Sequence, residues 1–221
     1  MRSTTWLHIS DLHLRESHAW SQDAVLSAMR DNIVRRREDG ATFDFILATG
    51  DLAYAGKASE YELAAAFFDE LTAASGVPRG KIFCIPGNHD IDRDRQKMSF
   101  AGALRSQNDI YSLLASREEV VTLMQRQTDF RNFQRTYFAG QERIPTTDGL
   151  GYVSLIEIND IRVAIVGLDS AWLAEGGLSD HGKLLLGEQQ VMNALSIAQS
   201  VGPHVVIAMG HHFQKIALIG G

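Results

Sequence analysis

Short continuous apolar runs alternate with stretches of helically spaced apolar residues along the first half of the chain. Short apolar runs at residues 5–10, 43–49 and 81–85 end at Gly, Pro or a polar cluster, which is typical of buried strands. The stretches between them carry apolar residues at helical spacing, which predicts two amphipathic helices. Their apolar faces are Val25, Met29 and Ile33 in the first helix and Leu63, Phe67 and Leu71 in the second. This β-α-β-α-β order predicts parallel strands joined by right-handed crossovers.

Both predicted helices carry signals at their ends. Ser21 is a suitable N-cap for the first helix, and Asp39-Gly40 closes it. Ser59-Glu60-Tyr61-Glu62 has the pattern of a capping box that opens the second helix, which stops near Gly76-Val77-Pro78.

The pattern changes over residues 92–143, which are polar, mostly helical in periodicity and without a strand signal. We interpret this segment as an insertion that can form a lid or cap. Phe130, Phe133 and Tyr137 share one helical face, which favours core packing over a surface on which bases stack. Arg131 and Arg135 share another face, which favours a solvated surface over a phosphate clamp.

Strand patterns return in the last third of the chain. Residues 151–158 and 161–168 form a predicted hairpin around the two-residue turn Asn159-Asp160. A helix is predicted from about residue 187 to 199, followed by a buried strand at 205–209. This last strand ends at Gly210-His211-His212.

Composition narrows the class of protein. The 221 residues suffice for one substantial α/β domain, and 45% hydrophobic with 22% charged residues is ordinary for a soluble globular protein. The net charge of −6 provides no globally basic surface for nucleic acid. Cys84 is the single cysteine and lies in an apolar run, which predicts a buried, inert thiol and a reducing compartment. With no signal peptide or membrane span in the pattern, we expect a cytoplasmic protein that contacts no membrane.

Three polar clusters follow the first three predicted strands. They are Asp11-Leu12-His13, Gly50-Asp51 and Gly87-Asn88-His89-Asp90. Because the carboxyl ends of neighbouring parallel strands converge on one crevice, these clusters predict a shared site. Aspartate, asparagine and histidine ligands in one crevice suit two divalent ions, and two ions indicate phosphoester hydrolysis. Mixed oxygen and nitrogen ligands favour Mn, Fe, Zn or Co over Ca without choosing among them.

The residue types suggest separate roles. Asp11 and His13 alternate along an extended segment, so both can address one ion, while Asp51 can place its two oxygens on two ions. A hydroxide bridging the two ions would be the nucleophile, and His89 would serve the leaving group with Asp90 orienting a neighbouring ring. Each cluster alone is also compatible with a cap or a turn, and only their joint order favours a site. His8 is interpreted as a satisfied core residue, whereas His181 lies in a loop that can reach the crevice.

Together with His211, these clusters resemble four of the five sequence blocks of the calcineurin-like metallophosphoesterases. The resemblance covers the chain apart from the 92–143 insertion. It implies an α/β fold of four αββα layers, in which two sheets lie between helices. It also implies a ligand set: Asp11 and His13 on the first metal, Asp51 bridging both, Asn88 and His211 on the second, and His89, with Asp90 behind it, facing the leaving group.

The fifth block of that family, Gly-His-x-His, supplies one further ligand to each metal. Gly210-His211-His212-Phe213 does not match it, because its last position is Phe. We therefore expect that the chain is part of a longer protein, or that a further domain or partner supplies the missing ligands. In either case the chain alone is expected to hold metal weakly. His211 is chosen over His212 because the fourth block places the ligand directly after its strand.

These patterns predict a metal-dependent phosphoester hydrolase, with phosphodiesterase activity on nucleotide or nucleic-acid substrates favoured. A phosphomonoesterase acting on proteins or small molecules is one alternative. The other is a sensor module that binds a phosphorylated ligand without hydrolysing it, which the mismatch at the fifth block supports.

Overall fold

The computed structural model describes residues 3–16, 19–95, 106–175, 180, 184 and 186–212. Its first sheet is parallel, in the order β1 (Trp6–Ile9), β2 (Phe45–Thr49) and β3 (Ile82–Ile85). Its second sheet has the order β4 (Ile144–Pro145), β5 (Tyr152–Ile158), β6 (Ile161–Gly167) and β7 (Val205–Met209). The α-helices are α1 (Ala19–Glu38), α2 (Ala58–Ser75), α3 (Gln107–Ala115), α4 (Arg117–Met124), α5 (Thr128–Tyr137) and α6 (Glu188–Ser200).

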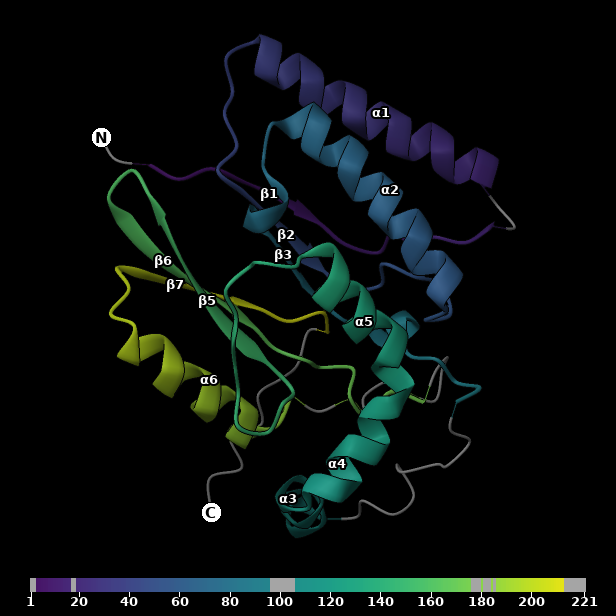
Figure 1. The fold of residues 1–221 in the computed structure, drawn as a ribbon, viewed down its shortest axis with the longest axis vertical. Coiled ribbons are helices and arrows are strands. Elements are labelled where there is room, and N and C mark those ends of the chain that lie inside the picture. Colours follow the sequence, from purple (N-terminus) through teal and green to yellow (C-terminus); the bar gives the residue numbers. More distant parts are fainter. Residues whose placement is uncertain are drawn as a thin grey trace.

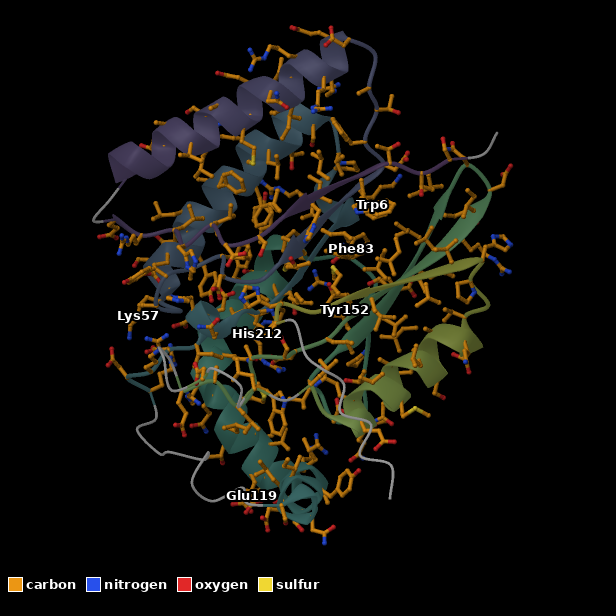
Figure 2. The ribbon with its side chains drawn as sticks, turned by 180° about the vertical axis from the view of Figure 1, so that it is seen from behind. Trp6, Lys57, Phe83, Glu119, Tyr152 and His212 are labelled. Carbon is orange, nitrogen blue, oxygen red and sulfur yellow. The ribbon has the colours of Figure 1, made fainter. Side chains whose placement is uncertain are left out.

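The sheets face each other, with α1 and α2 outside the first and α6 outside the second (Figure 1). This is the four-layer αββα arrangement that the resemblance implies. Side chains of both sheets fill the space between them, and Phe83 and Tyr152 mark this inner core in Figure 2. Since side chains alternate along a strand, Ile46 and Cys84 face the helical layer instead. Strands β2 and β3 are buried along their whole length, which explains their continuous apolar runs. The expectation of a buried strand is wrong for β1, in which Trp6 and His8 are exposed.

The predicted β-α-β-α-β order is confirmed, with Trp6 opposite Phe45 and Ile46 opposite Ile82 in parallel register. Two predicted helix starts are wrong. Helix α1 already begins at Ala19, so Ser21 is not its N-cap.

Helix α2 begins at Ala58 with Lys57 as its N-cap. The Glu60 carboxylate accepts the backbone amides of Ala55 and Lys57 at 2.9 and 3.0 Å. The glutamate therefore fixes the start of α2 before Ser59. A pattern search that begins at a Ser or Thr misses such a cap.

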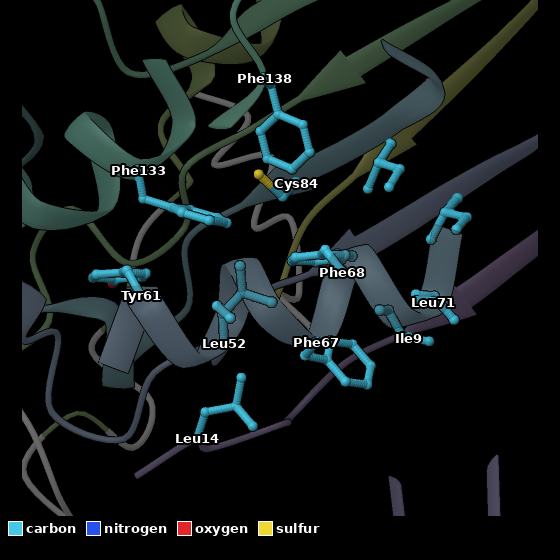
Figure 3. Packing of buried hydrophobic residues seen from close by; sticks show 14 of the residues in the cluster. Ile9, Leu14, Leu52, Tyr61, Phe67, Phe68, Leu71, Cys84, Phe133 and Phe138 are labelled. Carbon is cyan, nitrogen blue, oxygen red and sulfur yellow. The ribbon is translucent and has the colours of Figure 1, made fainter. Parts of the chain in front are cut away.

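Helix α5, in the second half of the 92–143 segment, belongs to the core. The Phe133 ring stacks on Tyr61 and Phe68 of α2, with ring centroids 5.4 and 6.2 Å apart (Figure 3). Phe130 and Phe133 are buried, which confirms the prediction of core packing. Helix α5 therefore continues the helical layer beside α2. Residues 96–105 lie outside the described part of the chain, and the lid stays a prediction.

The arginines of α5 differ from one another. Arg135 is exposed and donates to Asn132 at 3.1 Å, as expected for a solvated face. Arg131 is half-buried, and both terminal nitrogens donate to the Gly149 carbonyl at 3.1 Å.

The second half of the chain follows its predicted elements, but the expectation that strand β7 is buried is wrong, because Val205 and Val206 are 45% and 42% exposed and only Met209 is buried. Asn159 and Asp160 have φ angles of 51° and 63°, the left-handed pair of a type I′ hairpin turn between β5 and β6. Strand β7 pairs in parallel with β6 and delivers residues 210–212 to the edge where β1, β2 and β3 end. Cys84 is buried and free, and burial raises the pKa of its thiol to about 11, as expected for an inert thiol. Among the helices that the structure describes, none combines the length and hydropathy of a membrane span.

We predict that Phe133→Ala destabilises the whole domain. The lost packing against α2 should lower the free energy of unfolding by about 3–5 kcal/mol, measured by urea denaturation. Arg135→Ala, on the exposed face of the same helix, should change it by less than about 0.5 kcal/mol. If the Phe133→Ala variant were as stable as the Arg135→Ala control, the packing of α5 against α2 would not contribute to the stability of the domain.

Candidate metal centre

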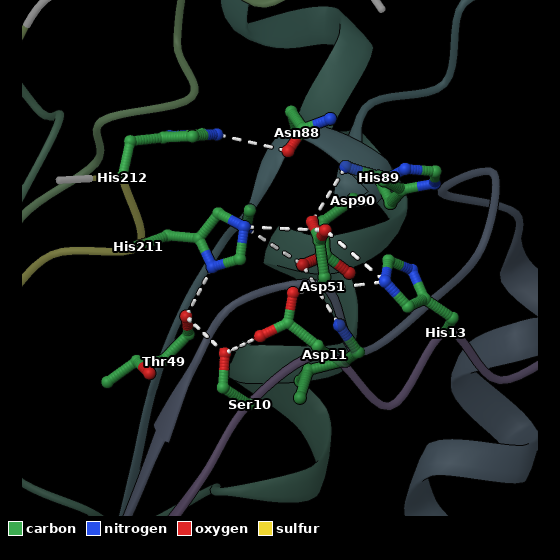
Figure 4. A network of polar contacts seen from close by, with 12 residues as sticks. Ser10, Asp11, His13, Thr49, Asp51, Asn88, His89, Asp90, His211 and His212 are labelled. Carbon is green, nitrogen blue, oxygen red and sulfur yellow. Dashed lines mark hydrogen bonds and ion pairs between the residues drawn. The ribbon is translucent and has the colours of Figure 1, made fainter. Parts of the chain in front are cut away.

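The predicted polar clusters converge in the structure. Asp11 follows β1, Asp51 follows β2, the turn Asn88–Asp90 follows β3, and His211 follows β7. Figure 4 shows these side chains gathered around Asp51. The convergence of strand ends on one crevice is therefore confirmed.

Asp51 is the centre of the cluster, and its side chain is only 4% exposed. The Nε2 atoms of His211 and His13 lie 3.3 and 3.7 Å from its Oδ2, and the His89 amide donates to Oδ1 at 2.8 Å. Burial alone would raise the pKa of Asp51, but the hydrogen bond and charge of His211 and the His89 amide outweigh it and leave the pKa below its usual value. The same contact raises the pKa of His211 to about 8 against the opposing effect of burial.

Among the residues that the structure describes, two groups of side chains have the geometry to hold a cation. One is Asp11, Asp51 and His211, and the other is His13, Asp51 and His89, with the ligand atoms of each group within 4.8 Å of one another. Asp51 is common to both, as a bridging carboxylate would be. The donor chemistry, carboxylate oxygen with imidazole nitrogen, suits divalent transition metals.

The grouping overlaps with the one that the resemblance implies. Nε2 of His13 lies 3.9 Å from Oδ1 of Asp11, as that pairing requires, but Asp11 also lies with His211, and His13 also lies with His89. The Asn88 Oδ1 atom lies 3.0 Å from Nε2 of His212, whose Nδ1 is 3.0 Å from the Ser170 hydroxyl. His212 was not among the predicted ligands, and its contact with Asn88 depends on the path of the chain after β7.

The backbone at the site is strained. Asp11, His13 and Asp51 have φ angles of 58°, 47° and 53°, in the left-handed region that residues other than glycine rarely adopt. The expectation of an extended segment at 11–13 is therefore wrong. The strained segment is held by parallel backbone bonds, from the Asp11 amide to the Gly50 carbonyl at 3.1 Å and from the His13 amide to the Asp51 carbonyl at 2.9 Å. Such strain at three ligand candidates is typical of a functional site.

Two glycines permit the close approach of these segments. A Cβ on Gly50, whose φ is +95°, would lie 2.6 Å from Nδ1 of His211. A Cβ on Gly87 would lie 2.1 Å from Oδ1 of Asp51. Glycine is therefore needed at both positions, because neither has room for a side chain.

The His89 ring is positioned by a group that the sequence did not indicate. Its Nδ1 lies 2.7 Å from the Tyr54 carbonyl, and because a carbonyl only accepts, Nδ1 carries a proton. Nε2 is then the atom left for a ligand or substrate. The Tyr54 ring lies beside it, 5.4 Å away between centroids, and the Arg15 guanidinium lies 4.2 Å over that ring.

The sequence led us to expect that Asp90 orients the His89 ring. In the structure Asp90 has a different role. Its fully buried carboxylate accepts the backbone amides of Leu52, Ala53 and Gly87 at 2.9–3.2 Å and the Tyr61 hydroxyl at 2.9 Å. These bonds tie the segment after β2 to the segment after β3. Burial raises the pKa of Asp90 to about 6, partly offset by the amides.

The other histidines considered in the sequence analysis lie at different places relative to the site. His211 Nδ1 lies 2.6 Å from the Thr49 carbonyl, which directs Nε2 to Asp51. His8 lies 2.7 Å from the Thr49 hydroxyl, so it is hydrogen-bonded as expected, but it is exposed and not part of the core. His181 and Phe213 lie outside the described residues.

Comparison with known proteins agrees with this geometry. The family model described as calcineurin-like phosphoesterase matches residues 4–215. A curated Bacillus subtilis (strain 168) relative, the uncharacterized metallophosphoesterase-like protein YydB, is 24% identical over 217 residues. The match covers 94% of this chain and 42% of the relative, so the chain spans less than half of that protein's length.

We predict that Gly87→Ala weakens metal binding by displacing the Asp51 carboxylate. Isothermal titration with Mn²⁺ should show affinity lower by about tenfold or more, as for a disturbed ligand position. Gly80→Ala is the matched control, since a Cβ there meets nothing within 4 Å. Equal Mn²⁺ affinity in the two variants would contradict the placement of Asp51 against Gly87.

Proposed function

This chain belongs to the calcineurin-like phosphoesterase family, and on that premise we propose that it hydrolyses phosphodiesters at the cluster around Asp51. The observation that carries the proposal is that Asp51 is shared by two groups of potential metal ligands. A shared carboxylate is what two neighbouring ions require.

We propose that Asp11, His13, Asp51, Asn88 and His211 hold two divalent ions, with Mn, Fe, Zn and Co as candidates. Ions bound there would activate a water molecule and neutralise the charge of the phosphoryl group. Asp51 stays ionised at neutral pH, because its pKa lies below the usual range, and so is ready to bind cations. The carbonyls of Thr49 and Tyr54 fix the rings of His211 and His89 in the orientation that exposes Nε2.

His89 belongs to one of the two groups of potential ligands, but we propose that His13 and Asp51 hold the ion on that side and that His89 serves the leaving group. As an imidazolium, it would donate the Nε2 proton to the oxygen that departs, while the Tyr54 carbonyl holds Nδ1. Asp90 then serves as a positioning residue, because it braces the backbone on both sides of the crevice.

We propose nucleotide or nucleic-acid diesters as the substrates. One observation supports this choice in addition to the Gly-Asn-His-Asp pattern. The half-exposed Tyr54 ring lies beside His89, where the leaving group would sit, and the Arg15 guanidinium lies over the Tyr54 ring. An aromatic ring and a cation next to a phosphoester suit a base and a further phosphate. A cytoplasmic location is part of the proposal, supported by the free thiol of Cys84.

We predict that the chain, supplied with Mn²⁺, hydrolyses bis-p-nitrophenyl phosphate faster than p-nitrophenyl phosphate, and that EDTA abolishes both activities. The comparison of kcat/KM for the two esters is the measurement. A preference for the monoester would overturn the diesterase proposal and leave the phosphoesterase proposal intact. Phosphoester binding without hydrolysis of either ester would instead favour a sensor module.

We predict that His89→Ala and Asp51→Asn differ in their metal content. His89→Ala should lower kcat by about a hundredfold or more, as for loss of a proton donor, while elemental analysis shows nearly unchanged metal. Asp51→Asn should lower both, because one carboxylate serves two ions. His204→Ala is the control, since His204 is exposed and bonds the Arg162 amide away from the crevice. Equal metal loss in both variants would make His89 a ligand.

A further inference from the structure

His212 lies beside the candidate metal centre, although the sequence did not mark it as a ligand. Its Nε2 atom lies 3.0 Å from Oδ1 of Asn88, and its ring packs edge-on against the His211 ring, with centroids 4.5 Å apart. Asn88 and His211 are the residues that the family resemblance assigns to the second ion. His212 itself belongs to neither group of side chains with the geometry to hold a cation. It therefore contacts two ligand candidates without being one.

Two neighbouring strands bring Ser170 to His212. Strands β6 and β7 are parallel, with Gly167 opposite Met209, and the Leu168 amide donates to the Met209 carbonyl at 3.1 Å. The chain leaves both strands side by side, so the segments that follow them stay in contact. The Ser170 hydroxyl lies 3.0 Å from Nδ1 of His212 and accepts the His212 backbone amide at 3.2 Å.

The segment that carries Ser170 is held by buried polar contacts. The Asp169 carboxylate accepts Gln127 Nε2 at 2.7 Å and the Ala171 amide at 2.9 Å. The Gln190 side chain of α6 accepts the Asp169 amide at 2.7 Å and donates to the Asp169 carbonyl at 3.1 Å. The side chains of Asp169, Gln127 and Gln190 are all buried, as is Ser170. Because a satisfied buried polar network is rigid, the Ser170 hydroxyl has a fixed position.

These hydrogen bonds define which nitrogen of His212 carries the proton. The Asn88 Oδ1 atom only accepts, so Nε2 of His212 donates to it. In a neutral ring, Nδ1 then accepts the Ser170 hydroxyl. If the Asn88 amide were turned over, its NH2 group would face His212, and the ring would need the opposite tautomer, with Nδ1–H donating to Ser170. The tautomer of His212 therefore reports which way the Asn88 amide points.

The orientation of the Asn88 amide decides whether this residue can bind a cation. Its oxygen has two lone pairs, and the bond from His212 uses one of them. The other stays available for an ion, whereas the amide nitrogen carries two protons and only donates. Figure 4 shows the Asn88 oxygen turned toward His212. Partners behind a metal ligand set its orientation in this way in many metal sites.

We propose that His212, held by Ser170, is a positioning residue for Asn88. The Ser170 hydroxyl donates to Nδ1, and Nε2–H donates to Asn88 Oδ1, so that the amide presents its oxygen to the second ion. His212 acts through Asn88 and not as a ligand. This inference rests on the proposed function, because it takes Asn88 as a metal ligand.

The first experiment tests the hydrogen bonds without metal. Long-range ¹H–¹⁵N correlation spectra of the 221-residue chain in EDTA distinguish the protonated from the unprotonated nitrogen of each histidine ring. We expect His212, assigned by correlation to its own backbone, as the Nε2–H tautomer. The Nδ1–H tautomer would overturn the proposal, because Asn88 would then face the ring with its NH2 group. In Ser170→Ala, where Nδ1 loses its donor, the Nδ1 signal should move, and an identical spectrum would show that Ser170 does not hold the ring.

The second experiment measures the stepwise binding of Mn²⁺ by isothermal titration. His212→Phe keeps a planar ring without a donor, and it should raise the Kd of the second Mn²⁺ by about ten- to a hundredfold while the first ion binds as in the wild type. His212→Gln restores an N–H donor and should recover most of the affinity, which a purely structural role of the ring would not predict. His204→Phe is the matched control, since His204 is exposed and bonds the Arg162 amide away from the crevice.

The outcomes separate this inference from the proposed function. Two Mn²⁺ ions bound by His212→Phe with unchanged affinity would overturn the positioning role and leave the hydrolase proposal intact. A wild-type chain that binds fewer than two ions would instead contradict the two-ion centre itself. Melting temperatures of the metal-free variants are the check on folding, and His212→Phe should melt like His204→Phe. The tautomer of the wild-type chain tests the inference even if no variant folds.

Discussion

A buried carboxylate beside imidazole rings is the interaction on which the rest of this structure depends. Asp51 is almost fully enclosed, yet contacts with His211 and the His89 amide keep its pKa low. To bring these groups together, the chain holds three candidate ligands in left-handed backbone conformations and uses glycine where segments touch. A buried charge held by strained backbone is unfavourable for folding alone, which is why the arrangement points to cation binding.

A series of side-chain contacts links the hydrophobic core to the candidate metal centre. Phe133 of α5 stacks on Tyr61, the Tyr61 hydroxyl bonds the Asp90 carboxylate, and Asp90 holds the backbone after both β2 and β3. The segments that present Asp51 and His89 are therefore braced from the helical layer behind them. Asp90 therefore supports the ligand candidates through the backbone that carries them, and not through the His89 ring.

Much of the fold was accessible from the sequence, because apolar runs, helical periodicity and the Asn159-Asp160 turn are local signals. The ligand candidates were accessible because each follows a strand whose direction is known. The Tyr54 carbonyl beneath His89 and the contact of His212 with Asn88 were not, since they arise from tertiary packing and backbone atoms without a residue signature. The start of α2 was misjudged because a single glutamate, Glu60, caps it from within.

The most direct test of the central claim is anomalous diffraction at the manganese edge from crystals of the Mn²⁺-loaded chain. We predict two anomalous peaks flanking the Asp51 carboxylate, each within coordination distance of one of its oxygens. A single peak, or peaks that do not contact Asp51, would contradict the account.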